Sequence, residues 1–206
     1  FLNSESLLEV HIPDGVRTIG DFAFAGCSRL ASINMPSSLK YIGIDAFEGC
    51  SSVKTVYVAD LKTWMGFDFW NSCDSNPLHS GSVMFIEGRL LTKIHIPKGV
   101  TVVGNMAFCG GLSFVEAVLP LGVKSIEEGA FMWCKSLEKV CMSEDLDSIG
   151  RAAFHWCENL EEIIIPDSVE SIGEHAFLCC RNLKTVYCRA AVPPMGAKEM
   201  FEYNVP

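Results

Sequence analysis

The sequence predicts an α/β repeat solenoid, and three observations lead to that fold class. The chain repeats itself with a 23-residue period, each repeat contains a short stretch of alternating apolar residues, and each contains a second apolar group with helical spacing. Alternation with period two is typical of a strand with one buried face, whereas apolar residues three and four positions apart share one face of a helix. One repeat is therefore expected to be a strand, a turn and a helical turn.

The repeat keeps a fixed register in five complete windows, residues 30–52, 91–113, 114–136, 137–159 and 160–182. Aligned, they read L-x-x-I-x-I-P-x-x-V-x-x-I-G-x-x-A-F-x-x-C-x-x, and the positions of this pattern are numbered below as columns. Proline in column 7 has no N–H to donate to a ladder and should end the strand. Glycine in column 14 is expected to adopt a backbone conformation that other residues resist. Because a lone repeat cannot cover its own apolar faces, the repeats must stack.

These columns resemble the BspA-like, or Treponema pallidum-type, leucine-rich repeats of bacterial surface proteins. The resemblance rests on the recurring IP, IG and AF-x-x-C elements and covers nearly the whole chain. It implies a right-handed leucine-rich-repeat coil with a parallel sheet on one face and short helical turns on the other. Three departures, Ser143 for proline, Glu127 for glycine and Gly111 for cysteine, are expected to weaken only their local rungs.

We expect residues 1–206 to form a single leucine-rich-repeat domain of about eight repeats, with an elongated 38-residue repeat at 53–90 and a divergent last repeat at 183–206. The chain begins within a repeat, and the AKEMF segment of the last repeat is expected to replace the AF element. We therefore expect a segment of a longer protein.

The elongated repeat contains a predicted hairpin and an aromatic cluster. The apolar stretches VMFI and RLLTKIHI flank Glu87-Gly88, a short turn in which glycine is expected to have a positive φ. The aromatic residues at 64–70 are expected to form a small core of their own, although they could instead be exposed as a bulge for a partner: Trp64, Phe67, Phe69 and Trp70.

Composition excludes several classes of partner. The net charge of -9 and the pI near 5.0 disfavour nucleic acid and anionic lipid, which require clustered Lys and Arg. No stretch approaches the length of apolar sequence that a membrane span requires, and the first residues do not read as an export signal. This segment is therefore not expected to insert into a membrane.

Half of the ten cysteines belong to the repeat. Column 21 holds a ladder of expected buried positions, Cys27, Cys50, Cys134, Cys157 and Cys180. Equivalent atoms stacked roughly 4.8 Å apart cannot surround zinc tetrahedrally, and parallel Cβ vectors disfavour disulfides, so free thiols and no metal are expected. The other five stand in different contexts, and one disulfide among them remains open: Cys73, Cys109, Cys141, Cys179 and Cys188.

The stretch RAAFHWCENL, which places His155, Trp156 and Cys157 side by side, has the residue types of a reactive cluster. Since Cys157 belongs to column 21 and Trp133 shares column 20 with Trp156, a packed surface pair of tryptophans is the favoured interpretation. The five histidines do not converge by repeat geometry, and the chain has no G-x-S-x-G, P-loop or dinucleotide fingerprint.

The carboxylates give no catalytic pair either. Glu161 and Glu162 are adjacent on a strand and are expected to point to opposite faces. We therefore expect a non-enzymatic protein without a cofactor. An enzyme with an unrecognised site near His155 or the aromatic segment 64–70 is the alternative.

Function is expected on the outward columns of the strands. Column 5 forms a rather apolar stripe, in which Asn34 and Cys141 accompany the candidate ligand-binding residues His11, Tyr57, His95, Val118, Ile164 and Tyr187. The leading hypothesis is a protein-binding or adhesion module. The family resemblance implies an extracellular or cell-surface location and a protein partner, such as a host extracellular-matrix protein or another bacterial surface protein. A structural spacer without a ligand is the second hypothesis.

Overall fold

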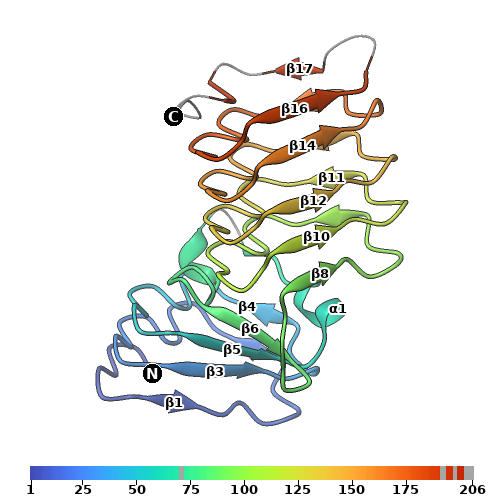
Figure 1. Ribbon diagram of the computed structural model, residues 1–206. Helices are drawn as coiled ribbons and strands as arrows, with labels where there is room; N and C mark the ends of the chain where they lie inside the picture. Colours follow the sequence, from blue (N-terminus) through green and yellow to red (C-terminus); the bar gives the residue numbers. More distant parts are fainter. Residues whose placement is uncertain (70–71, 191–193, 197–198, 202–206) are drawn as a thin grey trace.

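The protein is described by a computed structural model that covers the chain except residues 70–71, 191–193, 197–198 and 202–206. The chain winds into a β-solenoid of about eight turns, in which each turn adds one repeat to the stack. Figure 1 shows the N-terminal repeats at one end of the stack and the C-terminal repeats at the other. The predicted parallel-sheet solenoid with 23-residue spacing is therefore confirmed.

The first strands of the repeats form the surface that we call the front sheet. Equivalent residues of consecutive repeats are partners in parallel register, as in Ala117 with Val140. In strands such as Ser32–Met35, Thr55–Val58 and Glu162–Ile165, columns 4 and 6 are buried while columns 3 and 5 face outward. In the last front strand, Thr185–Cys188, the column 4 and 6 residues Val186 and Cys188 are exposed. The strands are β1 (Glu9–Val10), β3 (Ser32–Met35), β5 (Thr55–Val58), β8 (Lys93–His95), β10 (Glu116–Val118), β12 (Lys139–Cys141), β14 (Glu162–Ile165) and β16 (Thr185–Cys188).

Most repeats also have a second, two-residue strand at columns 12 and 13, which the sequence did not predict. Its column 13 residue is buried in the core and its column 12 residue faces outward or is half-buried, except in the last back strand, Met195–Gly196, where both residues are exposed. These back strands pair in parallel as β2-β4 and β9-β11-β13-β15-β17. They are β2 (Thr18–Ile19), β4 (Tyr41–Ile42), β9 (Val102–Val103), β11 (Ser125–Ile126), β13 (Ser148–Ile149), β15 (Ser171–Ile172) and β17 (Met195–Gly196).

The predicted helical turns at the AF elements are not confirmed. Columns 15 to 20 form runs of turns, and the helical segments of the described chain are α1 (Leu61–Trp64) and η1 (Cys73–Ser75), both in the elongated repeat. Hydrogen bonds to the next repeat hold each turn, as when Phe131 N–H donates to Ala153 O at 2.8 Å. The turn is therefore fixed by stacking, not by an internal helical ladder.

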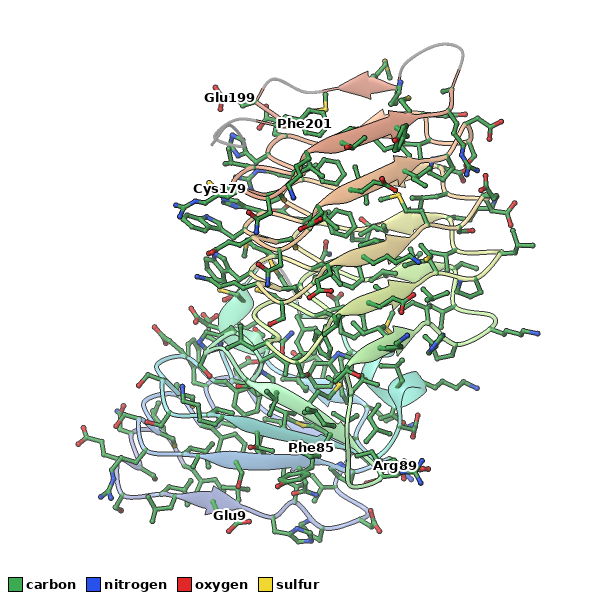
Figure 2. The ribbon with its side chains drawn as sticks, in the orientation of Figure 1. Glu9, Phe85, Arg89, Cys179, Glu199 and Phe201 are labelled. Atoms are coloured by element: carbon green, nitrogen blue, oxygen red, sulfur yellow. The ribbon has the colours of Figure 1, made fainter. Side chains whose placement is uncertain are left out.

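The column 18 phenylalanines stack face to face through the core. Phe108, Phe131, Phe154, Phe177 and Phe201 follow one another at centroid distances of 5.2 to 5.3 Å. Phe201 thus takes the place of the AF element in the last repeat, as its sequence predicted (Figure 2). Phe1 likewise stacks on Phe24 at 5.5 Å, which confirms that the chain begins in column 18.

The glycines of column 14 have a different role from the one predicted. None of Gly20, Gly43, Gly104, Gly150 and Gly173 has a positive φ, so the expected special conformation is wrong. A Cβ on Gly150 would instead lie 2.6 Å from the carbonyl carbon of Glu127 and 2.7 Å from the nitrogen of Glu128 in the preceding repeat. At Gly43, Gly150 and Gly173 glycine allows close approach of consecutive repeats. In the regular repeats the positive φ values fall in columns 9, 16 and 20.

At Gly111, where the repeat pattern has cysteine, the missing side chain is compensated by a neighbouring residue. A Cβ on Gly111 would overlap the ring of Phe114, which stands in column 1 where most repeats have leucine. Phe114 is fully buried and meets Phe108 edge to face at 5.5 Å. The large ring therefore fills the volume that the cysteine of column 21 occupies in other repeats.

The elongated repeat contributes an extra strand to the front sheet. Strands β6 (Val83–Ile86) and β7 (Arg89–Leu90) form the predicted antiparallel hairpin, in which Glu87 and Gly88 both have positive φ, 50° and 73°. This pattern is that of a type I′ turn. Because β6 also pairs in parallel with β5, the front sheet here runs β1-β3-β5-β6-β7.

The aromatic cluster of the elongated repeat is a core, as predicted. Trp64 and Phe69 are fully buried and Phe67 is 6% exposed, and their rings contact one another at 5.2 to 6.1 Å. Trp64 Nε1–H donates to Ala107 O at 2.8 Å, which ties α1 to the following repeat. The fourth member of the prediction, Trp70, lies outside the described residues.

In the elongated repeat the segment 74–78, which contains the sequence SNPL at 75–78, takes the place of an AF element. Phe47 N–H donates to Asp74 O at 2.9 Å, where other repeats use an AF residue. The fully buried side chain of Asn76 donates from Nδ2 to Met106 O at 2.7 Å, and its Oδ1 accepts from Leu78 N–H. A single amide therefore joins this turn to the next repeat.

Candidate protein-interaction surface

The candidate binding residues of column 5 all lie on the outward side of the front sheet. Tyr57 and Tyr187 are the most exposed apolar members, at 45% and 53%. His11 and His95 are also exposed, whereas Val118 and Ile164 are half-buried between their neighbours. Their placement follows from the strand period, because columns 4 and 6 point into the core.

The structure divides the stripe into two groups. Asn34, Tyr57 and Phe85 are register partners on β3, β5 and β6, and the rings of Tyr57 and Phe85 lie 5.5 Å apart. A separate sheet begins at β8, where His95, Val118 and Cys141 align, followed by Ile164 and Tyr187 on β14 and β16.

Phe85 was missed by the sequence analysis because its strand is additional to the 23-residue period. Figure 2 labels this residue on the front sheet close to the hairpin residue Arg89. The alternation in VMFI was the only available signal.

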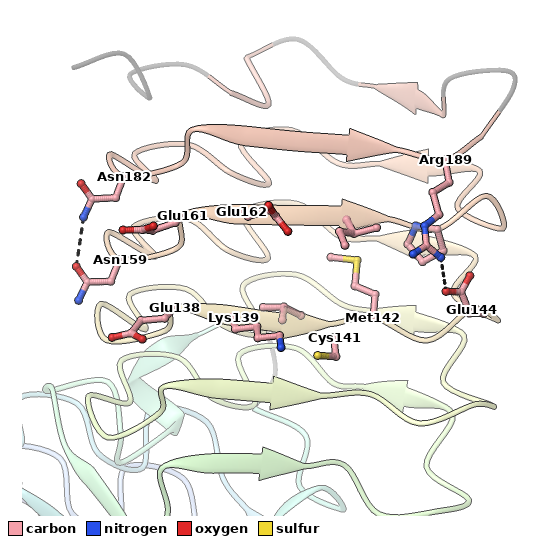
Figure 3. A pocket seen from close by; sticks show the side chains of 13 residues that line it. Glu138, Lys139, Cys141, Met142, Glu144, Asn159, Glu161, Glu162, Asn182 and Arg189 are labelled. Carbon is pink, nitrogen blue, oxygen red and sulfur yellow. Dashed lines mark hydrogen bonds and ion pairs between the residues drawn. The ribbon is translucent and has the colours of Figure 1, made fainter.

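A groove of about 830 Å³ lies over the C-terminal part of the front sheet (Figure 3). Cys141, Ile164 and Met142 supply apolar surface along its length. At one end Asn182 Nδ2 donates to Asn159 Oδ1 at 3.4 Å, and at the other Arg189 Nη1 donates to Glu144 Oε1 at 2.7 Å. The Arg189–Glu144 pair spans from the loop after β12 to the residue after β16, so it bounds the groove across the intervening repeat.

Acidic side chains dominate the charge of this C-terminal groove. Four carboxylates line it against two basic side chains: Glu138, Glu144, Glu161, Glu162, Lys139 and Arg189. Glu144 pairs with Arg189 and Glu161 with Lys184, whereas Glu138 and Glu162 form no ion pair within the described part of the chain. Two carboxylates of the groove are therefore available to a basic group of a partner.

The prediction that Glu161 and Glu162 point to opposite faces is wrong. Both are exposed and both line the groove. Glu162 is the first residue of β14, and Glu161 lies just before the strand, where its alternation does not apply.

Column 3 adds a row of alternating charge beside the stripe, Lys93, Glu116, Lys139 and Glu162. Lys93 Nζ lies 2.8 Å from Glu116 Oε2. The hydrogen bond to Glu116 raises the pKa of Lys93, and the same bond lowers the pKa of Glu116. Lys93 is exposed and Glu116 is half-buried, so solvent screens the ion pair. The pair therefore affects the charge pattern of the sheet surface more than it affects the stability of the fold.

A second groove of about 330 Å³ covers the N-terminal group of the stripe. His11, Asn34 and Tyr57 line it together with the carboxylates of Asp14 and Glu87. The Asn34 amide is not free to bind a ligand, because its Oδ1 accepts from Ile12 N–H at 2.6 Å and its Nδ2 donates to Ile12 O at 2.8 Å. This amide therefore has a structural role.

His155 and Trp156 lie on the turn side of the solenoid, away from the front sheet. The side chain of Trp156 lies between two cations, with Lys135 Nζ 5.6 Å and Arg181 Cζ 4.8 Å from its ring centroid. Trp133 and Trp156 line a common groove of about 530 Å³, and both have φ of 61° in column 20, where three other repeats have glycine. Burial lowers the pKa of His155, and the charges of His175 and Arg151 lower it further.

Cys157 is one rung of a buried thiol ladder, as predicted. All five column 21 cysteines are fully buried, and each Sγ–H donates to the carbonyl of a phenylalanine in the preceding repeat at 3.1 to 3.2 Å. Burial raises the pKa of Cys50 and of Cys180 to about 12. Thiols that remain protonated at neutral pH are poor nucleophiles and poor metal ligands.

The described residues contain no group of three or more His, Cys, Asp or Glu arranged to hold a metal ion. Across the same residues, no helix has the length and apolar character needed to cross a membrane.

Comparison with known proteins agrees with these features. Residues 1–77 and 80–204 match the BspA type leucine rich repeat region, in six copies. The fold and the exposed sheet define a repeat module for protein interaction. The chain belongs to the BspA type leucine-rich repeat family.

Three solved structures illustrate the likeness. The pneumococcal vaccine antigen PcpA has a TM-score of 0.60 at 21% identity, over 89% of this chain and 51% of that chain. The T. pallidum leucine-rich repeat protein TpLRR scores 0.49 at 24% identity, over 97% and 78%. A leucine-rich repeat protein from Bacteroides capillosus scores 0.43 at 33% identity, over 48% and 78%. This chain thus spans about half the length of the PcpA structure, and no curated protein matches it.

Proposed function

We propose that this chain is an adhesion module of an exported bacterial surface protein and that it binds a protein partner on its front sheet. The observation that carries the proposal is the C-terminal groove, which combines an outward apolar row with two carboxylates that lack an ion pair among the described residues. Such a surface offers both an apolar anchor and a charge that selects the partner.

The groove specifies the chemistry of the partner. Cys141 and Ile164 line the groove in column 5 of β12 and β14, and Tyr187, which is 53% exposed, continues this column on β16 next to the groove. Glu138 and Glu162 lie beside this row. The fitting partner is a protein segment with apolar side chains flanked by Lys or Arg, presented by a host extracellular-matrix protein or by another bacterial surface protein.

The extracellular location is part of the proposal. It is supported by membership of the BspA type family and by the fold shared with PcpA, which is described as a vaccine antigen of pneumococcus. Protease treatment of intact cells that express the full-length gene tests it. We expect the protease to remove from whole cells the epitope of an antibody against this chain. Full protection of that epitope from the protease until the cells are lysed would contradict the extracellular location.

The binding surface is tested by an alanine series in column 5, measured by biolayer interferometry against purified matrix proteins and bacterial surface proteins. Tyr187→Ala and Tyr57→Ala are compared with Tyr41→Ala, which removes a ring of similar exposure, 43%, from the back strand β4. A ring at the centre of an interface typically contributes about 2 kcal/mol or more, about 30-fold in affinity. We expect that loss for Tyr187→Ala and none for Tyr41→Ala.

The outcomes separate the alternatives. Unchanged affinity throughout the series would show that the front sheet does not bind the partner. A folded chain that binds no protein of the panel would instead favour a spacer that holds other domains apart.

A further inference from the structure

The front strands β12 and β14 are neighbours in the stack, but no hydrogen-bonded ladder joins them. β12 pairs with β10 and β14 pairs with β16, in two separate sheets. In most repeats the column 2 N–H donates to the column 2 carbonyl of the preceding repeat, as Lys184 N–H does to Glu161 O at 2.9 Å. Among the described residues, no such bond joins Glu161 N–H to Glu138 O. We call this opening between β12 and β14 the seam.

The same two repeats are joined on their other sides. Their back strands, β13 and β15, pair in parallel. On the turn side Phe154 N–H donates to Ala176 O at 2.8 Å, and after the front strands Ser168 Oγ–H donates to Leu146 O at 2.8 Å. The seam is therefore an opening of the front sheet and not a break between two domains.

The C-terminal groove of about 830 Å³ lies over the seam, because its lining residues come from both strands (Figure 3). At its floor the column 6 residue Met142 is half-buried, whereas its counterparts in the neighbouring repeats, Leu119 and Ile165, are buried. Methionine is unbranched and flexible, and it suits a space of variable shape. The core is thus accessible from the groove at this position.

The charges of column 2 give a physical reason for the seam. Glu138 and Glu161 occupy this column in consecutive repeats, and like charges on facing positions disfavour strand pairing. The next repeat has Lys184 in the same column, with its Nζ 3.4 Å from Glu161 Oε1, and there β14 and β16 are paired. What the seam lacks, relative to the paired strands, is a basic residue in column 2.

We propose that the seam accepts an extended segment of the partner protein, which pairs through its main chain with the free edges of β12 and β14 and places a Lys or Arg next to Glu138. Unpaired strand edges are a template for another chain. In such strand addition the main-chain hydrogen bonds supply affinity, and alternate side chains supply selectivity. The apolar side chains of the segment would contact Met142. This inference rests on the proposed function of the groove and adds the manner of binding.

Amide hydrogen exchange, followed by NMR in the free chain, tests the geometry first. The amides of Glu161 and Glu162 face the seam, and they are expected to exchange faster than those of Lys184 and Thr185, which donate to Glu161 O at 2.9 and 3.4 Å. Equal protection of the two pairs of amides would overturn the proposal.

The probe for binding is a synthetic peptide with the sequence of residues 183–189, LKTVYCR, carrying Cys188→Ser. This segment contains β16, which already pairs with β14, and it has the basic column 2 residue. Added to the isotope-labelled chain, it is expected to shift the amide signals of both β12 and β14 and to slow the exchange of Glu161. The same peptide with N-methylated main-chain amides is expected to shift neither strand, because it keeps the side chains and loses the donors.

Two charge reversals complete the test. Glu138→Lys is expected to abolish the shifts caused by the peptide, whereas Glu9→Lys, the same change on the distant strand β1, is expected to leave them intact (Figure 2). Amide spectra verify that both variants are folded. Equal shifts from the N-methylated peptide, no shifts from the unmodified one, or shifts confined to β16, which would indicate strand displacement, would each overturn the inference.

Failure of the inference is distinguishable from failure of the proposed function. If no peptide pairs at the seam while Tyr187→Ala still weakens binding of a partner protein, the inference is overturned and the proposed function stands. If the peptide pairs at the seam while no protein of the panel binds, the manner of binding is supported and the adhesion role is contradicted.

Discussion

Restoring the repeat consensus at Gly111 should destabilise the protein. A Cβ there would overlap the Phe114 ring and lie 2.6 Å from its Cδ2. The ring cannot swing aside, since Phe114 is fully buried and packed edge to face on Phe108. Gly111→Cys is therefore expected to cost about 1–3 kcal/mol, the usual cost of overpacking a core. In a chain of this length that lowers Tm by about 2–12 °C.

The second consensus change should rescue the first. Phe114→Leu alone leaves a void and loses an edge-to-face contact, at about 1–2 kcal/mol. Gly111→Cys with Phe114→Leu recreates the pairing of Cys134 with Leu137 and of Cys157 with Leu160, all fully buried. The double variant should therefore lie within about 1 kcal/mol of the wild type, with a coupling energy of about 1–3 kcal/mol.

Urea unfolding of the wild type, the two single variants and the double variant, followed by circular dichroism, measures this cycle. The free energies of unfolding come from the midpoints, with one common slope of free energy against urea concentration. The reverse exchange in the next repeat, Cys134→Gly with Leu137→Phe, serves as the control and should show the same sign of coupling. Strictly additive effects of the two single changes would refute the idea that the ring replaces the thiol.

Three further expectations concern the core and the thiols. Phe131→Ala should lower the free energy of unfolding by about 3–5 kcal/mol in urea titrations, because the ring is fully buried between two others. Phe1→Ala, at the 70% exposed end of its stack, should lower it far less. Equal losses of unfolding free energy in the two variants would contradict the stacking. Gly150→Ala should destabilise by about 1–3 kcal/mol, whereas Gly104→Ala, whose Cβ would meet only Phe67 O at 4.0 Å, should be neutral or slightly stabilising in the same assay. Iodoacetamide at pH 8 should modify Cys188 and Cys73 well before Cys50 and Cys180, whose pKa of about 12 keeps them protonated, and mass spectrometry showing early labelling of column 21 would contradict the ladder.

The pH dependence of stability should carry a contribution from His155. Its pKa in the folded chain is lowered by burial, so the unfolded chain takes up a proton first as the pH falls. The free energy of unfolding should therefore decrease from pH 7.5 to pH 5, through the ordinary histidine pKa of about 6.5, and decrease less in His155→Asn. An identical profile for both proteins in urea titrations would exclude this contribution.

Most of the fold could be predicted from the 23-residue period of the sequence. Columns 1, 4, 6, 18 and 21 were placed in the core from apolar residues alone, and the hairpin at Glu87-Gly88 followed from two flanking apolar stretches. Residues such as Phe1 and Phe201 could be assigned at the ends because their columns are fixed by counting.

Backbone geometry within a repeat was less predictable. The tight apposition of Gly150 to the preceding repeat and the positive φ of Trp133 and Trp156 depend on contacts between repeats, which a single aligned window does not contain. The same limit made the AF element look helical, because its spacing fits one helical turn while its hydrogen bonds go to the next repeat.

The candidate surface was predicted in outline and missed in detail. Column 5 was correctly placed on the outward side, but Phe85 joins it from an inserted strand that has no column number. The pairing of Arg189 with Glu144 bridges positions that no period relates, so only the folded chain shows it.

Side chains one repeat apart lie side by side in this solenoid, one set pointing inward and one set pointing outward. Nuclear Overhauser effects in the isotope-labelled chain test it directly, because parallel strands lie about 4.8 Å apart. We expect cross-strand contacts for Ala117 with Val140 and for Ile163 with Val186, and also for Val56 with Met84, a pair that the inserted segment takes out of the regular period. Cross-strand contacts in another register, or none between these pairs, would contradict it.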